Sequence, residues 1–276
     1  MLAVALLIAQ AAAPAPPPAC SGLAVLLGLD ADRADVPLGD VKISDVRRAA
    51  DTIILVRSCK GGVHALWIPR ETVLHLPGGR PVEAGRALQQ DGVEGLDAAL
   101  AATLGARPDF HALLDLRGFA TLVDAVGGVA WPGGGAQGLP RCARRIDGRE
   151  ITRYVRARPG DTASDLRRIR RQMLLVQAFA DSLPRTGVTR MARATVALPK
   201  VGKTDLGVVS SARMTLRIAR EPLQCATLPG RAGGRDYRPA PGALSFARHF
   251  LGISAWKPDR GRRAAAGLRG EFKATA

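Results

Sequence analysis

Short apolar runs alternate along the chain with longer Ala- and Leu-rich segments of helical spacing. The short runs, rich in Val, Ile and Leu, predict β-strands at Leu23–Leu29, Thr52–Arg57, Val63–Ile68, Ala112–Leu116 and Ile151–Arg156. The longer segments predict helices at Gly92–Leu104, Gly118–Val126, Ala163–Ser182, Ser210–Ala219 and Gly242–Leu251. Because Cys59–Gly62 is short and contains two glycines, it predicts a hairpin between two of the strands. The alternation as a whole predicts a three-layer α/β/α domain around a central mixed sheet.

The longest of the expected helices has a continuous apolar stripe. Its members are spaced three and four residues apart, which is the spacing of a core-facing helix side. They are Leu166, Ile169, Met173, Val176 and Ala180. We therefore expect this helix to pack on the sheet along that side.

The N-terminal region has the pattern of an export signal. Met1–Ile8 is apolar, small residues follow up to Ala13, and Pro14–Pro18 then interrupts any helix. The apolar run is too short to span a bilayer, which needs about 20 residues. The pattern predicts a signal-peptide-like segment at 1–13, a Pro-rich linker at 14–22, a domain at 23–252 and a basic disordered tail at 253–276. We expect an exported protein, and the family resemblance described below implies a location in the extracytoplasmic cell envelope, with the membrane surface among its partners.

Composition adds one strong constraint, which is charge. The chain has 276 residues, 47% of them hydrophobic, so it can form one domain with a sizeable core. Its formal net charge is +16, which favours acidic partners such as anionic lipids, anionic glycopolymers or nucleic acid. Nucleic acid is disfavoured because aromatic residues, which stack on bases, make up only 4% of the chain.

The four cysteines are Cys20, Cys59, Cys142 and Cys225. None forms a Cys-x-x-Cys pair, so a zinc site is not expected. An exported protein can form disulfides, and we expect a Cys142–Cys225 pair. Lipid attachment at Cys20 is an alternative, although Pro17 stands where a lipidation signal has a branched apolar residue.

Arginines gather at a corner between two expected elements. If Ile151–Arg156 is extended, Arg156 and Arg158 point to the same side. In the helix that follows, Arg168 and Arg171 are three residues apart and share a face. Guanidinium groups are planar, permanently charged and bidentate, so such a corner suits a pyrophosphate group. A solvated basic helix face is the alternative.

Several motifs, in order along the chain, resemble those of the LytR–CpsA–Psr cell-envelope proteins. The resemblance runs from about residue 23 to 252 and rests on these stretches: Leu26–Asp30, Asp51–Val56, Ile68–Thr72, Gly118–Val129, Tyr154–Arg158, Asp165–Gln172, Thr204–Leu206 and Leu228–Gly230. Each motif alone is modest, but the ordered set is specific.

The resemblance implies a phosphotransferase. Such an enzyme moves a glycopolymer from an undecaprenyl-pyrophosphate carrier to a cell-wall acceptor such as peptidoglycan. The implied pyrophosphate-binding residues are Arg70, Arg156, Arg158, Arg168, Arg171 and Gln172, and the implied catalytic residues are Arg70, Arg156, Arg158 and Asp51. Asp51 with Asp40, or Asp45 in its place, would hold Mg²⁺ or Mn²⁺. Asp165 would orient Arg158 or Arg168, or would cap the helix.

The chain departs from the family pattern at two relevant places. Glu71 stands where the family has Asp, and Arg48 lies three residues before Asp51 where the family's Arg lies two before. These differences leave open an alternative function, a non-catalytic binder of polyprenyl phosphates or of anionic glycopolymer.

Overall fold

A computed structural model of the chain describes residues 20–29, 38, 42–105, 107–131, 144–156, 164–233 and 236–253. Within these residues, no helix is long and apolar enough to cross a membrane. The predicted segment at 1–13 lies outside this range, as does the predicted tail at 253–276 except for its first residue, Ile253.

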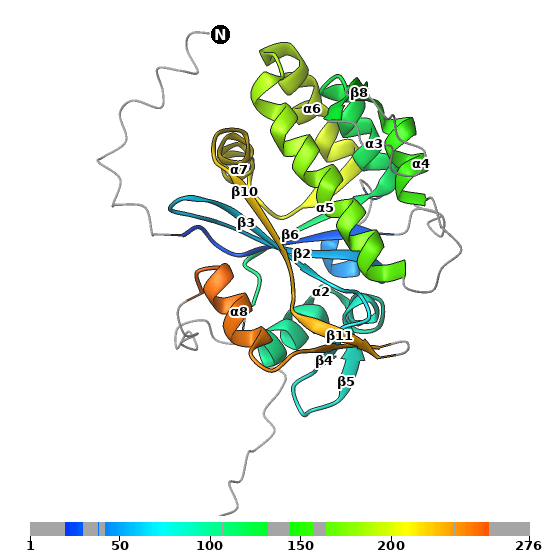
Figure 1. The fold of residues 1–276 in the computed structure, drawn as a ribbon, viewed down its shortest axis with the longest axis vertical. Helices are drawn as coiled ribbons and strands as arrows, with labels where there is room; N and C mark the ends of the chain where they lie inside the picture. Colours follow the sequence, from blue (N-terminus) through cyan, green and yellow to red (C-terminus); the bar gives the residue numbers. More distant parts are fainter. Residues whose placement is uncertain are drawn as a thin grey trace, which may run out of the picture.

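The centre of the fold is a six-stranded mixed sheet (Figure 1), with the strand order β10-β3-β2-β1-β6-β9. Its members are β1 (Ala24–Leu29), β2 (Ala50–Cys59), β3 (Gly62–Ile68), β6 (Phe110–Asp115), β9 (Gly202–Thr204) and β10 (Leu223–Thr227). β2 is antiparallel to both β1 and β3, whereas β1 pairs with β6, and β3 with β10, in parallel. The predicted hairpin between β2 and β3 is confirmed, with Cys59 opposite Gly62.

Helices cover both faces of the sheet (Figure 1), which confirms the three-layer prediction. One layer consists of α2 (Ala84–Leu104) and α8 (Ala243–Phe250). The other consists of α3 (Leu116–Ala125), α4 (Gly148–Arg156), α5 (Ser164–Ser182), α6 (Val188–Val201) and α7 (Val208–Arg220). We call the first the α2 layer and the second the α5 layer.

Short elements complete the described fold. Three two-stranded sheets pair β4 (Val73–His75) with β5 (Pro81–Glu83), β7 (Val129–Trp131) with β8 (Arg144–Ile146), and β11 (Gly230–Gly233) with β12 (Asp236–Pro239). Two 3-10 turns, η3 (Ile43–Asp45) and η4 (Leu183–Arg185), lie before β2 and after α5.

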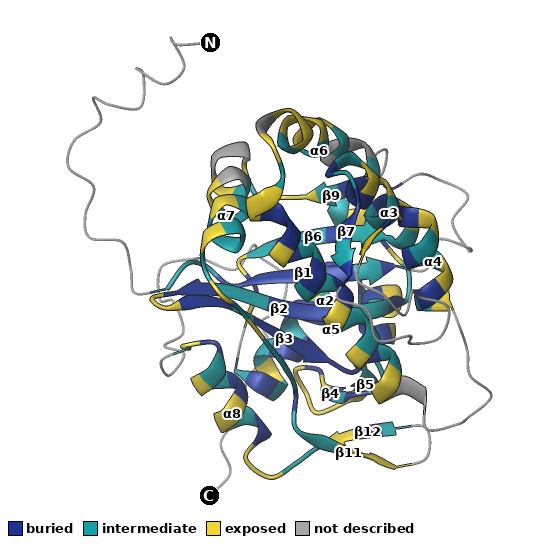
Figure 2. Cartoon of the chain, turned by 45° about the horizontal axis from the view of Figure 1, so that its top comes forward, coloured by how far each residue is buried: buried dark blue, intermediate teal, exposed yellow. Residues whose placement is uncertain are grey.

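The apolar core divides along the layers. The larger cluster lies between the sheet and the α2 layer, and it includes the fully buried Leu27, Leu55, Leu88 and Leu100. On the opposite face, α5 packs on a smaller cluster around Ile54 and Trp67. The core between the sheet and the α2 layer is therefore larger than the cluster under α5. Figure 2 shows that much of the central sheet is buried.

The predicted strand at Ile151–Arg156 is wrong, because these residues belong to the helix α4. Asp147 and Glu150 cap its N-terminus reciprocally: the Glu150 amide donates to Asp147 Oδ1 at 2.8 Å and the Asp147 amide to Glu150 Oε2 at 3.2 Å. This arrangement is a capping box, and it fixes the first helical turn. Ile151 and Tyr154, three residues apart, are then buried on one side.

The long helix α5 follows its prediction with one exception. Ile169 and Ala180 are buried and Met173 and Val176 are half-buried, but Leu166 is 46% exposed. Leu166 lies in the first turn of α5, beyond the end of the sheet cluster, so its expected core position is wrong. The helix α6 was not predicted, and its inward positions Met191 and Ala194 form only a weak stripe.

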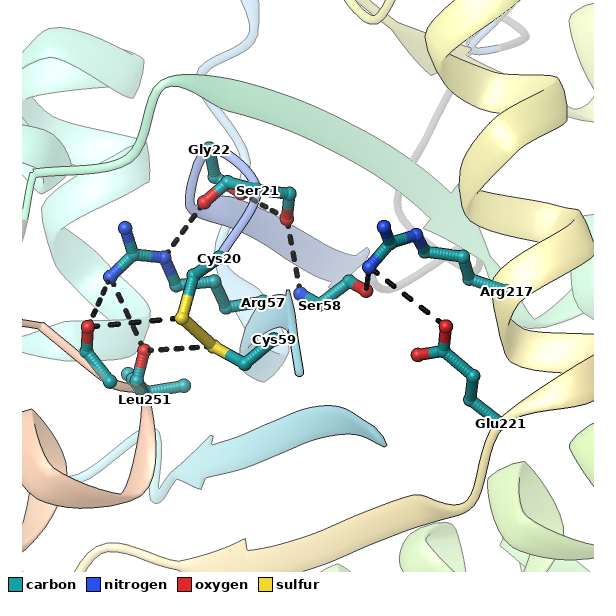
Figure 3. Close-up of a disulfide and its surroundings, with 10 residues drawn as sticks. Cys20, Ser21, Gly22, Arg57, Ser58, Cys59, Arg217, Glu221 and Leu251 are labelled. Atoms are coloured by element: carbon teal, nitrogen blue, oxygen red, sulfur yellow. Dashed lines mark hydrogen bonds and ion pairs between the residues drawn. A yellow bond between two sulfur atoms is a disulfide. The ribbon is translucent and has the colours of Figure 1, made fainter. Parts of the chain in front are cut away.

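A disulfide joins Cys20 to Cys59, the last residue of β2 (Figure 3). The expected Cys142–Cys225 pair is therefore wrong: Cys225 is a free cysteine in β10, and Cys142 lies outside the described residues. The pairing also engages the Cys20 sulfur that lipid attachment would require. Arg57 supports the same corner by donating hydrogen bonds to the carbonyls of Ser21, Leu251 and Gly252.

Breaking the disulfide is expected to destabilise the domain. The bond closes a loop with a sequence separation of 39, for which chain entropy gives about 4 kcal/mol. We expect Cys20→Ser/Cys59→Ser to lose about 2–4 kcal/mol in the free energy of unfolding by urea, and reduction of the native chain to do the same. Cys225→Ser is the matched control and should keep the native value. Equal stability of all three proteins would contradict the prediction.

A buried histidine ties the other edge of the sheet together. His111 in β6 lies 2.7 Å from Asp205 Oδ2 through Nδ1 and 3.0 Å from Asp97 Oδ1 through Nε2. Burial lowers the pKa of His111, but the hydrogen bonds and charges of Asp97 and Asp205 raise it further, so the net shift is upward. His111 thus links α2 to the chain that follows β9.

This triad predicts a stability that falls at alkaline pH. A histidine whose pKa is raised by folding stabilises the folded state fully below its unfolded pKa of about 6.5, and that contribution is lost as pH rises through the folded pKa. Each unit of upward shift corresponds to about 1.4 kcal/mol. We expect the free energy of unfolding by urea to fall above about pH 6.5 in the wild type, and to fall less in His111→Gln. The exposed His75→Gln serves as control and should keep the wild-type slope; identical slopes for wild type and His111→Gln would refute the assignment.

Candidate active site

The candidate site lies where β1, β3 and β10 end and β2 begins. Asp51 is the second residue of β2, and Arg70 follows the end of β3. Arg70 Nη1 donates to Asp51 Oδ1 at 2.6 Å, and Arg70 Nε donates to Glu71 Oε1 at 2.5 Å. Burial lowers the pKa of Arg70, but Glu71 and Asp51 raise it more through hydrogen bonds and charge, so the guanidinium is firmly cationic.

A second arginine reaches the same carboxylate from the α5 layer. Arg168 Nη2 lies 3.2 Å from Asp51 Oδ2 and donates to the Asp51 backbone carbonyl, also at 3.2 Å. Asp51 therefore holds two guanidinium groups, one from the residues after β3 and one from the α5 layer. The side chains of Arg70 and Arg168 are 39% and 23% exposed, so both can be reached by a ligand.

The remaining residues of the predicted arginine corner do not all converge. Arg171 is stacked over the Tyr154 ring, with 5.9 Å between Cζ and the ring centroid, so it joins α5 to α4. Gln172 is half-buried on α5, and Arg156 is exposed in the last turn of α4. Because residues 151–156 are helical, the strand geometry that placed Arg156 beside Arg158 does not apply.

Close backbone packing holds Arg70 in place. The Gly85 amide, in the first turn of α2, donates to the Arg70 carbonyl at 2.7 Å. A Cβ at Gly85 would lie 2.8 Å from the Ala50 carbonyl oxygen and 3.0 Å from Arg70 Cβ, which only glycine avoids. The start of α2 thus supports the position of Arg70.

An apolar seam lies beside the charged residues. Along α5, Ile169 is buried and Met173 and Val176 are half-buried against Ile54 and Trp67 of the sheet. Half-buried Leu223 and Cys225 of the edge strand β10 border the same cluster. Trp67 is 1% exposed and its Nε1 has no hydrogen-bond partner.

Cys225 adds no reactive group to this seam. Burial, with a smaller effect of the Asp181 charge, raises the pKa of its thiol to about 11. The thiol is therefore protonated at neutral pH, and only the thiolate is an effective nucleophile.

Metal binding would rely on few protein ligands. The described part of the chain contains no group of three or more His, Cys, Asp or Glu side chains with metal-site geometry. Two carboxylates, Asp51 and Glu71, do converge on Arg70. Asp45 is exposed on η3, where its carboxylate accepts a hydrogen bond from Ser44 Oγ. Asp40 and Arg158 lie outside the described residues, as does the side chain of Asp165.

Two contacts of the site were not expected from the sequence. Glu71, a departure from the family pattern, binds Arg70 directly. Tyr154, predicted to lie in a strand, supports Arg171 from a neighbouring helix. The capping box at Asp147 and Glu150 was the signal that could have placed Tyr154 on a helix.

Comparison with known proteins decides the family. The sequence profile of the LytR_cpsA_psr family matches residues 22–131 and 136–238, which is more than half of the chain. The chain belongs to the LytR–CpsA–Psr family. Both Asp51 and Arg168 fall inside the matched regions. Membership implies transfer of glycopolymers to the cell wall.

Solved structures agree with the LytR–CpsA–Psr fold. The chain is similar to TagT bound to LI-WTA (TM-score 0.66, 21% identity, 84% of this chain and 91% of that one). It is also similar to the LytR-Csp2A-Psr enzyme from Actinomyces oris (TM-score 0.67, 17% identity, 86% and 91%) and to TagV of B. subtilis (TM-score 0.66, 16% identity, 84% and 98%). No match is found among curated protein sequences. At these identities the likeness establishes the fold alone.

Because Arg168 and Arg70 both pair with Asp51, we predict that Arg168 is the α5 cation that binds an anion at the site. Loss of a charged hydrogen bond costs about 1.5–3 kcal/mol, so Arg168→Gln should lower the affinity for Mg²⁺-pyrophosphate roughly 10- to 100-fold by isothermal titration calorimetry. Arg170→Gln, an exposed arginine on the same helix, is the matched control and should bind as the wild type does. Equal losses of affinity for both variants would mean that binding depends on overall positive charge, and not on the position in which Asp51 holds Arg168.

Proposed function

We propose that this LytR–CpsA–Psr protein transfers a phosphoglycosyl group from an undecaprenyl-pyrophosphate carrier to a hydroxyl of a cell-wall acceptor such as peptidoglycan. The proposal rests on the observation that α5 contributes both a cation and an apolar surface to the site. Its Arg168 reaches Asp51 at the sheet end, and the next residue, Ile169, starts the apolar seam on the sheet.

An amphiphilic donor fits this arrangement. A pyrophosphate needs paired, rigid cations, which Arg70 and Arg168 offer from two sides. A polyprenyl chain needs an apolar surface, which Met173 and Val176 extend from the site toward β10. The structure of TagT with LI-WTA supports the idea that a protein of this fold binds such a ligand.

In this proposal the Asp51 carboxylate occupies the two arginines until a substrate phosphate binds them. Its carboxylate neutralises both arginines in the absence of ligand. When pyrophosphate oxygens bind Arg70 and Arg168 in its place, Asp51 is released toward the phosphates. Binding therefore replaces the two ion pairs of Asp51 with ion pairs to pyrophosphate, and the released Asp51 carboxylate then needs another cation beside the phosphates.

Mg²⁺, with Mn²⁺ as a substitute, is the ion that we propose for the site. Asp51 and Glu71 are the hard oxygen donors beside Arg70, and Mg²⁺ commonly binds one or two carboxylates together with substrate phosphates. When bound, such an ion neutralises charge that develops on the phosphate oxygens. Asp40, or Asp45 in its place, remains the second ligand expected from the sequence.

The transfer itself is a substitution at phosphorus. The acceptor oxygen forms a bond to the sugar-linked phosphorus, and the bond from that phosphorus to the bridging oxygen breaks. Polyprenyl monophosphate leaves, and the hydroxyl proton is released. Arg70 and Arg168 lower the barrier by fixing the two phosphates and stabilising the leaving group.

The test is Mg²⁺-dependent release of polyprenyl phosphate from a short polyprenyl-pyrophosphate sugar. We expect turnover by the wild type and a loss of at least about 100-fold in Asp51→Asn and Arg70→Ala. Arg86→Gln, an exposed arginine outside the site, is the control and should retain turnover. Tight binding of the donor without turnover by the wild type would favour the non-catalytic binder, and no binding would reject both functions.

A further inference from the structure

Charge is segregated between the two helical layers. Helices α3 to α7 of the α5 layer contain fourteen Lys or Arg residues and four Asp or Glu residues. Helices α2 and α8 of the α2 layer contain two arginines and three acidic residues. Most of the helical positive charge therefore lies on one face of the molecule, far more than the two arginines at Asp51 require.

Exposed apolar side chains lie on the same helices. In the described part of the chain, five large hydrophobic side chains are exposed, and four of these belong to the α5 layer: Leu166, Leu174, Val196 and Leu216. Figure 2 shows exposed positions among intermediate ones along α6 and α7. Leu216 is 51% exposed and Leu174 is 47% exposed.

The apolar and cationic side chains alternate along single helix stripes. On α7, Arg213, Leu216 and Arg220 are spaced three and four residues apart and all three are exposed. On α5, Arg170 and Leu174 are exposed at a spacing of four, and the exposed Asp181 lies on the same side seven residues after Leu174. Within the described residues, none of these three arginines forms an ion pair with a carboxylate. The stripes are thus cationic surfaces with apolar side chains between the charges.

We propose that the outer face of α5 and α7 is a docking surface for an anionic lipid bilayer. Arg170, Arg213 and Arg220 would contact headgroup phosphates, and Leu174 and Leu216 would enter the boundary with the acyl chains. An anionic polymer would match the arginines but has no apolar interior for the leucines. The combination of both side-chain types favours the bilayer.

This docking would also shorten the path of a lipid donor. α5 presents Leu174 outward and its neighbours Met173 and Val176 toward the apolar seam. α5 and α7 contact each other above the sheet, and α7 leads into β10, which borders the seam. A prenyl chain could therefore pass from the bilayer to the seam with little exposure to water. The docking itself needs no donor and no transfer, so it can fail or succeed independently of the proposed reaction.

The test is co-sedimentation of the full chain with vesicles of phosphatidylcholine, with and without phosphatidylglycerol. Each Lys or Arg near an anionic surface contributes about 1 kcal/mol, so Arg213→Gln/Arg220→Gln should lower the partition coefficient roughly 20- to 30-fold. Leu174→Ser/Leu216→Ser should lower it at least about fivefold, because apolar contact is lost. All variants keep the same residues at both chain ends, so any contribution of those ends cancels.

Two controls come from the opposite layer and its surroundings. Arg80→Gln/Arg86→Gln removes the same charge from arginines that are 60% and 63% exposed, and Phe246→Ser removes an exposed apolar side chain from α8. Both controls should bind as the wild type does. Losses equal to those of the α5 and α7 variants, or no binding of the wild type to anionic vesicles, would overturn the proposal.

One further outcome would identify a different partner. If the arginine variant loses binding to vesicles and to soluble dextran sulfate equally, while the leucine variant loses neither, the face recognises an anionic polymer. That result would also overturn the bilayer proposal. Thermal unfolding of each variant, expected at the wild-type midpoint because all the substituted side chains are exposed or half-exposed, would show that the losses are not due to unfolding.

Discussion

The ion pairs of Asp51 are the constraint on which the site depends. A single carboxylate at the start of β2 binds Arg70, which follows β3, and Arg168, which comes from α5. These contacts join the sheet edge to the α5 layer, which covers its face of the sheet with a smaller core than the α2 layer does. An anion that replaces Asp51 would have to satisfy both arginines at once, so the same contacts that order the empty site also select a bidentate ligand.

The opposite end of the sheet is organised for stability. There the Cys20–Cys59 disulfide, the Arg57 hydrogen bonds and the His111 triad connect segments that are distant in sequence. None of these groups lies at the end of the sheet where Asp51 is found. One end of the sheet is thus stabilised by a disulfide and by charged hydrogen bonds. At the other end, the charged side chains around Asp51 can exchange partners.

Much of the fold follows from local sequence patterns, because long apolar stripes and short β-branched runs have few alternative structures. The strands around Leu27, Ile53 and Leu66 and the helix around Ile169 could be predicted for this reason. Residues 151–156 could not, because Ile151 and Tyr154 suit a helix side as well as a short buried strand, and the capping box at Asp147 decides between them. The ordered family motifs identified Asp51, Arg70 and Arg168, but which cation binds which carboxylate depends on long-range packing. Arg171 shows this most clearly. It lies three residues after Arg168 on the same helix, but it stacks over Tyr154 of α4.

The disulfide corner also determines how the domain can be attached to anything else. The chain enters the described fold at Cys20 and leaves it at Ile253, and Cys20 Sγ lies 4.0 Å from the Gly252 carbonyl oxygen (Figure 3). β2 runs from this corner to Asp51 with a rise of about 3.3 Å per residue, so the site lies about 25 Å away. A fusion partner, an affinity tag or an immobilising linker joined directly at Cys20 or Ile253 would therefore emerge from the same corner, at the end of the sheet opposite the arginines.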